Sequence, residues 1–296
     1  MKSYAVYNNK GGVGKSTISL LLLDIFSSIK VGDIRQARVL VIDVDTQSST
    51  SISLLGNRRI QELKNKNLTF CNNLLNALKN KKGVDFSPYI TKKEATKTTK
   101  KRLKLGAIDV MCVKKDSLIE FEKKCSIENT IKIATYIKQN LSKNYDFIFF
   151  DLPANIDSRN KLSMLAMQAS DMVLIPTEPT KITINALNDT IENIKYAQNL
   201  MIHDEPRAMK NAIVLNKTDR RTKQYKLHHK EIDDIARENN IIVFESFLPS
   251  APTLASSTDE TLCFETLKEK YLTYYDKTKK IALELIKHSN LTIKTN

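Results

Sequence analysis

The stretch "YAVYNNKGGVGKSTISLLLLDIF", residues 4–26, decides the fold of this chain. An apolar run is followed by Gly-Gly-Val-Gly-Lys-Ser (11–16) and then by leucine-rich helical sequence. Glycines let backbone N–H groups wrap a phosphate, and the following helix adds the positive end of its dipole. This order predicts a phosphate-binding loop in which Lys15 contacts the β- and γ-phosphates and Ser16 coordinates Mg²⁺. A second lysine, Lys10, precedes the glycines and requires its own explanation.

The chain is long enough for one large α/β domain, and it is strongly basic. It has 296 residues and a formal net charge of +14. We expect residues 1–296 to form a single domain. A charge of this size indicates a polyanionic partner, either nucleic acid or an anionic membrane surface. A lysine-rich composition inherited from an AT-rich genome is the plainer explanation, and both remain open at this point.

Cysteine spacing and hydropathy both favour a cytoplasmic protein. The four cysteines show no CxxC spacing, which disfavours disulfides, zinc and iron–sulfur clusters; they are Cys71, Cys112, Cys125 and Cys263. No apolar run at the start has the length of a signal peptide, and none elsewhere reaches transmembrane length. We therefore expect a cytoplasmic location and no membrane partner.

Continuous apolar runs alternate with helical patterns along the chain. Continuous apolarity is typical of parallel strands that are covered on both faces. The predicted strands cover 4–8, 38–43, 107–113, 145–151, 171–176, 211–216 and 240–244. The predicted helices cover 17–30, 126–143, 185–201, 226–239 and a long terminal segment at about 262–288. The alternation predicts an α/β fold with a doubly wound, mostly parallel sheet and helices on both faces.

Residues 79–104 differ from the rest of the chain. They hold ten basic and two acidic residues, a net charge of +8. The segment "KKEATKTTKKRLK" within this stretch has little apolar surface to bury. It predicts a basic insertion, either an exposed loop or a solvated helix.

Carboxylates follow two of the predicted strands. "VLVIDVDTQSS" places Asp43 and Asp45 at one strand end, and "DFIFFDLPA" places Asp151 at another. An Asp in this position can also serve as a turn or N-cap residue. The carboxyl ends of parallel strands meet at one sheet edge, where ligands of open α/β sheets bind. Three carboxylates there predict a magnesium site beside the phosphate loop.

Five motifs in this order give the chain its resemblance to a known family. They are "KGGVGKS" from Lys10, "IDVDTQSS", "FIFFDLPA", "DMVLIPTEP" and "VLNKTDRRT". From Met1 to about residue 265 the chain resembles the ParA family of partition ATPases. That family belongs to the deviant Walker A group of P-loop NTPases, together with MinD and the nitrogenase iron protein. The resemblance implies an ATP hydrolase, slow alone and stimulated by a partner, that dimerises around two ATP molecules.

The same resemblance implies roles for individual residues. Lys10 would reach across the dimer to the partner's phosphates, and Asp45 would orient the attacking water. Asp43 and Asp151 would hold the magnesium shell together with Ser16. The implied catalytic residues are Lys10, Lys15 and Asp45; the implied nucleotide contacts are Lys10, Gly11, Gly12, Val13, Gly14, Lys15, Ser16, Thr17, Asn216, Asp219 and Pro249.

The identity of the base remains open between two readings. Asn216-Lys217-Thr218-Asp219 matches the N-K-x-D signature with which GTPases read guanine. Similar ParA-like sequences continue with Asp-Arg-Arg and are adenine-specific, so "DRRT" (219–222) favours ATP, with Asn216 at the base. Pro249 is the candidate for a loop that closes over the base, although its context is also that of an ordinary turn.

The resemblance also suggests partners. ATP dimers of this family bind DNA non-specifically, which implies a nucleoid-associated protein that acts on a plasmid or chromosome cargo with a ParB-like centromere-binding partner. The candidate DNA contacts follow the base-binding strand and are Arg220, Arg221, Lys223 and Lys226. A MinD-like membrane-associated ATPase, with "KIALELIKHSNLTIK" (280–294) as its tail, is the alternative. An iron-protein-like redox role is disfavoured, because no glycine-rich cluster loops flank Cys112 and Cys125.

Overall fold

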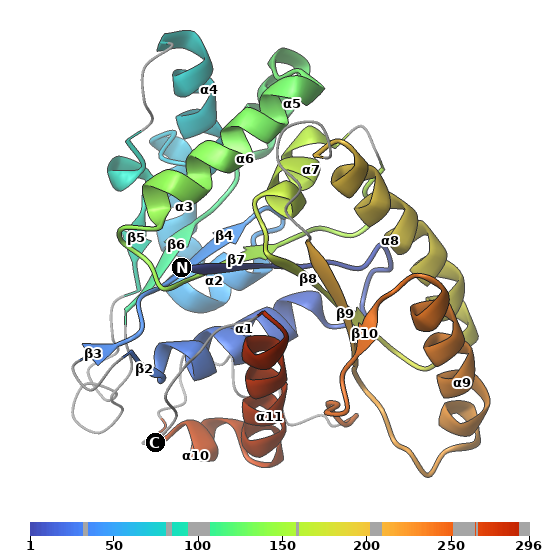
Figure 1. Ribbon diagram of the computed structural model, residues 1–296. Coiled ribbons are helices and arrows are strands. Elements are labelled where there is room, and N and C mark those ends of the chain that lie inside the picture. The colour runs from blue at the N-terminus through green and yellow to red at the C-terminus, as the bar shows by residue number, and fades with distance from the viewer. Residues whose placement is uncertain are drawn as a thin grey trace.

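A computed structural model describes residues 1–31, 35–80, 85–93, 107–157, 160–201, 209–250, 264 and 266–289. Its centre is an eight-stranded sheet with the order β10-β9-β8-β1-β7-β4-β6-β5 (Figure 1). All the pairs are parallel except that of the edge strand β5 with β6. The strands are β1 (Lys2–Val6), β4 (Val39–Asp43), β5 (Thr91–Lys92), β6 (Ile108–Met111), β7 (Phe147–Asp151), β8 (Met172–Thr177), β9 (Lys210–Leu215) and β10 (Ile242–Val243).

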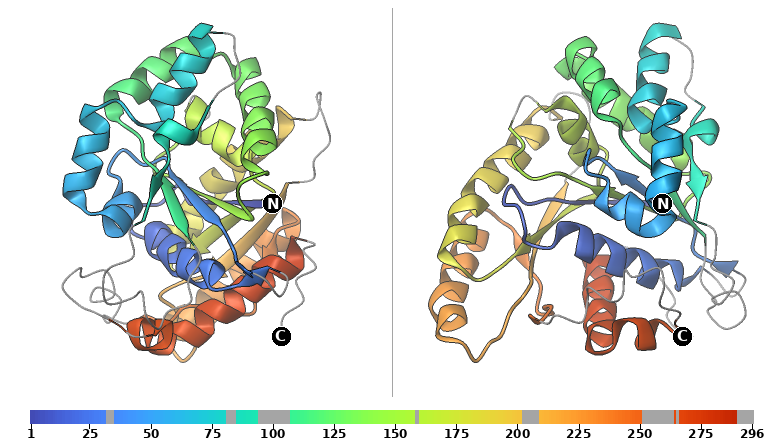
Figure 2. Two further views of the ribbon diagram at one scale, coloured as in Figure 1. Left: turned by 90° about the vertical axis from the view of Figure 1, so that its left-hand side faces the viewer. Right: turned by 180° about the vertical axis from the view of Figure 1, so that it is seen from behind.

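Helices cover both faces of the sheet, and most residues of the central strands are apolar for that reason. One face packs on α1 (Lys15–Ser27), α10 (Leu267–Tyr271) and α11 (Thr273–His288). The other packs on α4 (Phe70–Asn80), α5 (Lys115–Lys124), α6 (Ile127–Leu141), α7 (Lys161–Gln168), α8 (Lys181–Asn199) and α9 (Lys223–Glu238). Successive strand residues alternate between the two cores, as Val41 and Ile42 of β4 do. Figure 2 shows the same three layers from two further directions.

The predicted fold class is confirmed, since each of the seven predicted strands overlaps a strand of the sheet. Their ends differ by up to a few residues; the first strand begins at Lys2 and ends at Val6 rather than covering 4–8. Several other elements were not predicted. These are α2 (Ser49–Leu55), α3 (Asn57–Asn65), α4, α5, α7 and the short strands β2 (Lys30–Val31), β3 (Arg35–Gln36) and β5.

Part of the basic segment 79–104 lies within the described residues. Residues 79–80 end α4, Ser87–Tyr89 form a 3₁₀ turn (η1), and β5 pairs with β6 through Thr91 and Lys92. Phe86 is buried in the main core and fixes the segment there. Residues 81–84 and 94–106 of the predicted insertion lie outside the described residues.

The predicted terminal helix over 262–288 is two helices rather than one. Leu272 has φ 48° and ψ −122°, outside the right-handed helical region, so the hydrogen-bond ladder cannot run through it. Residues 262–263 lie outside the described part. Ile281, Ala282 and Leu285 of α11 are buried in the core against α1 and the sheet. Among the described residues, no helix combines the length and apolarity that crossing a bilayer requires.

One buried carboxylate connects three parts of this face. Asp24, in the middle of α1, is 2% exposed. Its Oδ2 accepts from Lys270 Nζ and from Tyr271 Oη of α10, both at 2.6 Å. Its Oδ1 lies 3.7 Å from the Nζ of Lys93, the residue after β5. Burial alone would raise the pKa of Asp24, but the two ammonium groups hold it well below its usual range.

Candidate functional site

The predicted phosphate loop lies between β1 and α1, at the carboxyl edge of the sheet. Gly12 and Gly14 have φ of 80° and 89°, conformations that glycine adopts without strain. Helix α1 begins at Lys15, and its N-cap Gly14 provides no side-chain cap for the first-turn N–H groups. Left-handed glycines beside uncapped N–H groups form a concave set of donors, which is the arrangement that binds an anion.

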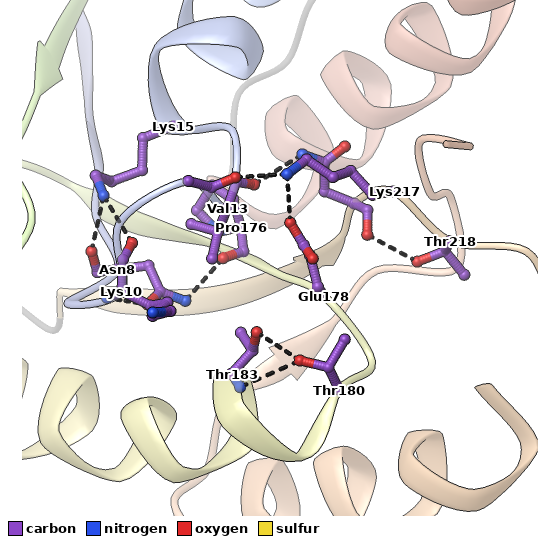
Figure 3. Close-up of polar contacts among 12 residues, drawn as sticks. Asn8, Lys10, Val13, Lys15, Pro176, Glu178, Thr180, Thr183, Lys217 and Thr218 are labelled. Carbon is purple, nitrogen blue, oxygen red and sulfur yellow. Dashed lines mark hydrogen bonds and ion pairs between the residues drawn. The ribbon is translucent and has the colours of Figure 1, made fainter. Parts of the chain in front are cut away.

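Lys15 is buried inside the curl of this loop. Its side chain is 8% exposed, and its Nζ donates to the backbone oxygens of Asn8 and Lys10, each at 3.0 Å (Figure 3). Burial lowers the pKa of Lys15, while the carboxylates of Asp151 and Asp45 oppose this shift. An ammonium group at this position can meet phosphate oxygens with little loss of water, because it is already desolvated.

Asn8 fixes the path of the loop, a role that the sequence did not indicate. Its Nδ2 donates to the oxygen of Pro176 at the end of β8, at 2.8 Å. Its Oδ1 accepts from the N–H of Lys10, also at 2.8 Å. The backbone of Lys10 is therefore held in place while its side chain is exposed at the surface. A lysine placed in this way can reach a group outside its own chain.

Two of the predicted carboxylates lie side by side. Asp43 and Asp151 are register partners at the ends of β4 and β7, and both are buried. Asp151 accepts from Ser19 Oγ at 3.0 Å, from Thr50 Oγ1 at 2.5 Å, and from the hydroxyl of Ser16. The structure thus brings together the three residues predicted to surround the metal.

The electrostatics of this pair fit a cation. Burial, and then the neighbouring Asp151, raise the pKa of Asp43, although the N–H of Ser51 donates to it at 2.8 Å. Burial also raises the pKa of Asp151, against the hydrogen bonds from Thr50, Ser16 and Ser19. Within the described residues no three His, Cys, Asp or Glu side chains form a closed metal site. The donor set suits Mg²⁺, which keeps several waters and takes phosphate oxygens as further ligands.

Asp45 lies at the same edge, two residues beyond Asp43, and is half-buried. Its Oδ1 accepts from the N–H of Gln47 at 2.9 Å, and its own N–H donates to Asp43 Oδ1 at 3.3 Å. The carboxylate is therefore oriented by the backbone and remains accessible. This is the geometry needed to hold a water molecule in a fixed direction.

Two residues that follow β9 donate hydrogen bonds to carbonyl oxygens of the phosphate loop. Asn216 Nδ2 donates to the oxygen of Val13 at 2.8 Å. Lys217 Nζ donates to the oxygen of Gly12 at 2.6 Å and pairs with Glu178 Oε1 at 2.7 Å (Figure 3). Asn216 was predicted only as a base contact, and Lys217 was not predicted at all. Its position in the N-K-x-D match was the signal that could have indicated it.

Asp219 is engaged within its own turn. Its carboxylate accepts from Arg221 Nε at 3.0 Å and Nη2 at 2.9 Å, and these bonds hold the pKa of Asp219 well below its usual range. Pro249 is tied to the C-terminal helix, since its oxygen accepts from Tyr274 Oη at 2.9 Å. Neither contact was expected for a residue predicted to face the nucleotide.

The four predicted DNA contacts are close in sequence, but their side chains differ in exposure and in the contacts that they make. Arg220 stacks 4.4 Å above the ring of Phe247 and donates to the oxygen of Glu245 at 2.9 Å. The side chain of Arg221 is 90% exposed, and Lys223 and Lys226 are exposed at the start of α9. Because Arg221 is paired with Asp219, the exposed charge of this group comes mainly from Lys223 and Lys226.

The loop glycines give a graded test of this geometry. A Cβ on Gly11 would meet nothing within 4 Å, one on Gly12 would meet nothing but would sit at φ 80°, and one on Gly14 would lie 2.2 Å from Asn216 Nδ2. We expect Gly11→Ala to leave the stability of the nucleotide-free protein nearly unchanged and Gly12→Ala to cost about 1 kcal/mol. Gly14→Ala should cost about 2 kcal/mol or more, because strain and a clash coincide. Urea unfolding measures the series, and equal stabilities at all three positions would contradict the loop described above.

Comparisons with known proteins agree with this arrangement. A family model described as an AAA domain matches residues 1–204. A ParA family protein of Mycoplasma pneumoniae is 30% identical over 53% of this chain, and the match spans 57% of that relative's length.

Solved structures share the fold over the whole chain. A variant of McdA from Cyanothece in complex with ATP has a TM-score of 0.68 at 14% identity, covering 100% of this chain and 99% of that one. The pNOB8 ParA bound to nonspecific DNA has a TM-score of 0.65 at 16% identity, covering 97% and 98%. The chain therefore belongs to the AAA domain family, and the predicted resemblance to ParA family proteins is confirmed.

Proposed function

We propose that this member of the ParA and MinD-type ATPases is a Mg-ATP-dependent dimerising switch that binds DNA non-specifically in its ATP state and partitions a plasmid or chromosome cargo. The observation that carries the proposal is the contrast between the two lysines of the loop. Lys15 is buried inside the loop, whereas Lys10 has a fixed backbone and an exposed side chain. The first would hold a phosphate of its own chain, and the second would reach one bound by another copy.

Phosphoryl transfer depends on positioning and on neutralising the charge of the phosphoryl oxygens. Ser16, with Asp43 and Asp151 behind it, would hold Mg²⁺, which screens that charge when bound. Lys15 supplies a desolvated cation from the same chain, and Lys10 would supply a second one from the partner. Asp45, oriented by the Gln47 N–H, would direct a water toward the γ-phosphate. Hydrolysis would then require the dimer, and a ParB-like partner would act on the dimer.

Adenine is the proposed base. Reading guanine through the N-K-x-D segment needs a free carboxylate at Asp219, but Arg221 binds that carboxylate with two hydrogen bonds. Competition between ATP and GTP for the purified protein tests the assignment. A clear preference for GTP would overturn it.

DNA is the proposed polyanion. Arg221, Lys223 and Lys226 are exposed beside the base-binding strand, and one of the similar folds is a ParA bound to nonspecific DNA. A MinD-like role would need an apolar helical face for the membrane, but Ile281, Ala282 and Leu285 of α11 are buried in the core. The membrane alternative is therefore less well supported.

A co-sedimentation experiment tests the proposal, with DNA or anionic liposomes, each with and without ATP. We expect wild type to sediment with DNA only with ATP, and more weakly as salt rises. Asp45→Ala should hydrolyse ATP about 100-fold more slowly and stay on DNA longer, because the water is no longer directed. Lys10→Ala should bind ATP but sediment with DNA no better than without nucleotide.

The control is Arg237→Ala, an exposed charge at the far end of α9, which should behave as wild type. Normal hydrolysis by Asp45→Ala would contradict its assigned role. Sedimentation with liposomes but not with DNA would favour the membrane alternative.

A further inference from the structure

We infer that Lys217, oriented by Glu178, is a positioning residue that holds the phosphate loop in its anion-binding shape. The inference rests on the proposed nucleotide site and adds to it a pair of residues on two other strand ends. Lys217 follows β9, and Glu178 follows β8. Neither was a candidate on the sequence.

Two consecutive carbonyls of the loop are held by two consecutive residues after β9. Lys217 Nζ donates to the oxygen of Gly12 at 2.6 Å, and Asn216 Nδ2 donates to that of Val13 at 2.8 Å (Figure 3). A planar trans peptide points its C=O and its N–H in opposite directions. Holding both carbonyls toward β9 therefore turns the next N–H groups, those of Val13 and Gly14, away from β9. These N–H groups are donors that a bound phosphate requires.

The backbone of residues 216–218, which carries these two donors, is itself held by hydrogen bonds. Lys217 has a left-handed φ of 50°, which is uncommon for a residue with a side chain. The neighbouring N–H groups maintain it: that of Asn216 donates to Thr177 O at 2.9 Å, and that of Thr218 to Leu248 O at 3.0 Å. The lysine therefore projects from a rigid turn over the loop.

Glu178 gives the lysine its direction. Its Oε1 lies 2.7 Å from Lys217 Nζ, and its side chain is 21% exposed, against 47% for the lysine. The carboxylate holds the ammonium group beside the Gly12 carbonyl, so the flexible lysine stem loses less freedom on making that bond. Because the pair is partly exposed to water, we expect a moderate effect on affinity rather than loss of binding.

Lys217→Met tests the inference by two measurements. We expect the Kd for ADP and for a non-hydrolysable ATP analogue to rise together, about five- to tenfold, since both use the same loop amides. Amide hydrogen exchange of residues 9–17 in the nucleotide-free protein should accelerate several-fold. The melting temperature of the nucleotide-free protein should change little, which separates a positioning role from a structural one.

Further variants make the test specific. Lys217→Arg should restore most of the affinity, and Glu178→Gln should raise the Kd about twofold alone and not at all in the Lys217→Met background. Lys195→Met, an exposed lysine of α8, is the matched control and should match wild type. Unchanged loop exchange in Lys217→Met would overturn the inference. If wild type bound no nucleotide, the proposed function would fail, and the exchange measurement would still decide whether Lys217 holds the loop.

Discussion

Lys15→Met is expected to weaken ATP binding by about 1,000-fold, the largest effect on function that the structure indicates. Lys15 is 8% exposed, and its ammonium group lies in the curl of the loop, where it donates to Asn8 O and Lys10 O at 3.0 Å. A charge-assisted contact made in such a desolvated place is much stronger than one at the surface. Methionine keeps the length and the apolar stem of the side chain, so the loss reports the charge.

Titration with a fluorescent ATP analogue and Mg²⁺ measures this loss. Thermal unfolding without nucleotide should show that Lys15→Met still folds, with some loss of stability because the carbonyl of the buried Asn8 loses a donor. Lys195→Met again serves as the control. A decrease in affinity smaller than tenfold would mean that phosphate is held by the loop amides alone, and Lys15 would lose its assigned role.

The sheet and the phosphate loop could be predicted because their signals are local. Continuous apolar runs identified each long strand, and the glycine-rich sequence between β1 and α1 has few alternatives to a phosphate loop. The proximity of Asp43 and Asp151 could be predicted because the ends of parallel strands share one edge of the sheet. In the structure the two residues are register partners. The family kinship rested on motifs in the same places.

The remainder depends on contacts between distant residues. Lys217 reaches Gly12 across 205 positions of sequence, and nothing near Lys217 indicates that partner. β5 was not predicted because it lies among basic residues. This two-residue edge strand is held by its pairing with β6 and by the burial of nearby Phe86 in the core. Leu272 breaks the terminal helix through its backbone conformation, while its side chain suits a helix well. Propensity is a weak guide wherever tertiary contacts decide the conformation.

Asp24 is the plainest case of a residue that only the fold explains. It lies within the apolar sequence "LLLLDIF", where a carboxylate is costly unless it is paired. Lys270 and Tyr271, which bind its Oδ2 at 2.6 Å, follow it by 246 and 247 residues. Lys93, which follows the edge strand β5, places its Nζ 3.7 Å from the Oδ1 of Asp24. The helix that follows the phosphate loop is thereby joined to the C-terminal helices and to the basic stretch.

Asp24→Asn is expected to lower the free energy of unfolding by about 3 kcal/mol at pH 7. The substitution keeps the volume but leaves two ammonium groups around a neutral amide, and one of them, Lys270, is held in a partly buried position. Glu62→Gln is the control, since it removes an exposed carboxylate that is paired with Arg58 and Arg59. That change should leave the free energy of unfolding close to that of wild type, because the pair is exposed to water. Urea unfolding at pH 7 measures both variants.

The pH dependence separates the ion cluster from simple packing. The folded pKa of Asp24 is held below the unfolded value of about 3.9, so its stabilisation is fully present above that pH and is lost as the pH falls toward the folded pKa. The difference between wild type and Asp24→Asn should therefore be constant from pH 7 to about pH 5 and shrink below about pH 4, at up to about 1.4 kcal/mol per pH unit. A difference that stays the same at pH 3 would show that shape, rather than charge, makes Asp24 hold α1 to its neighbours.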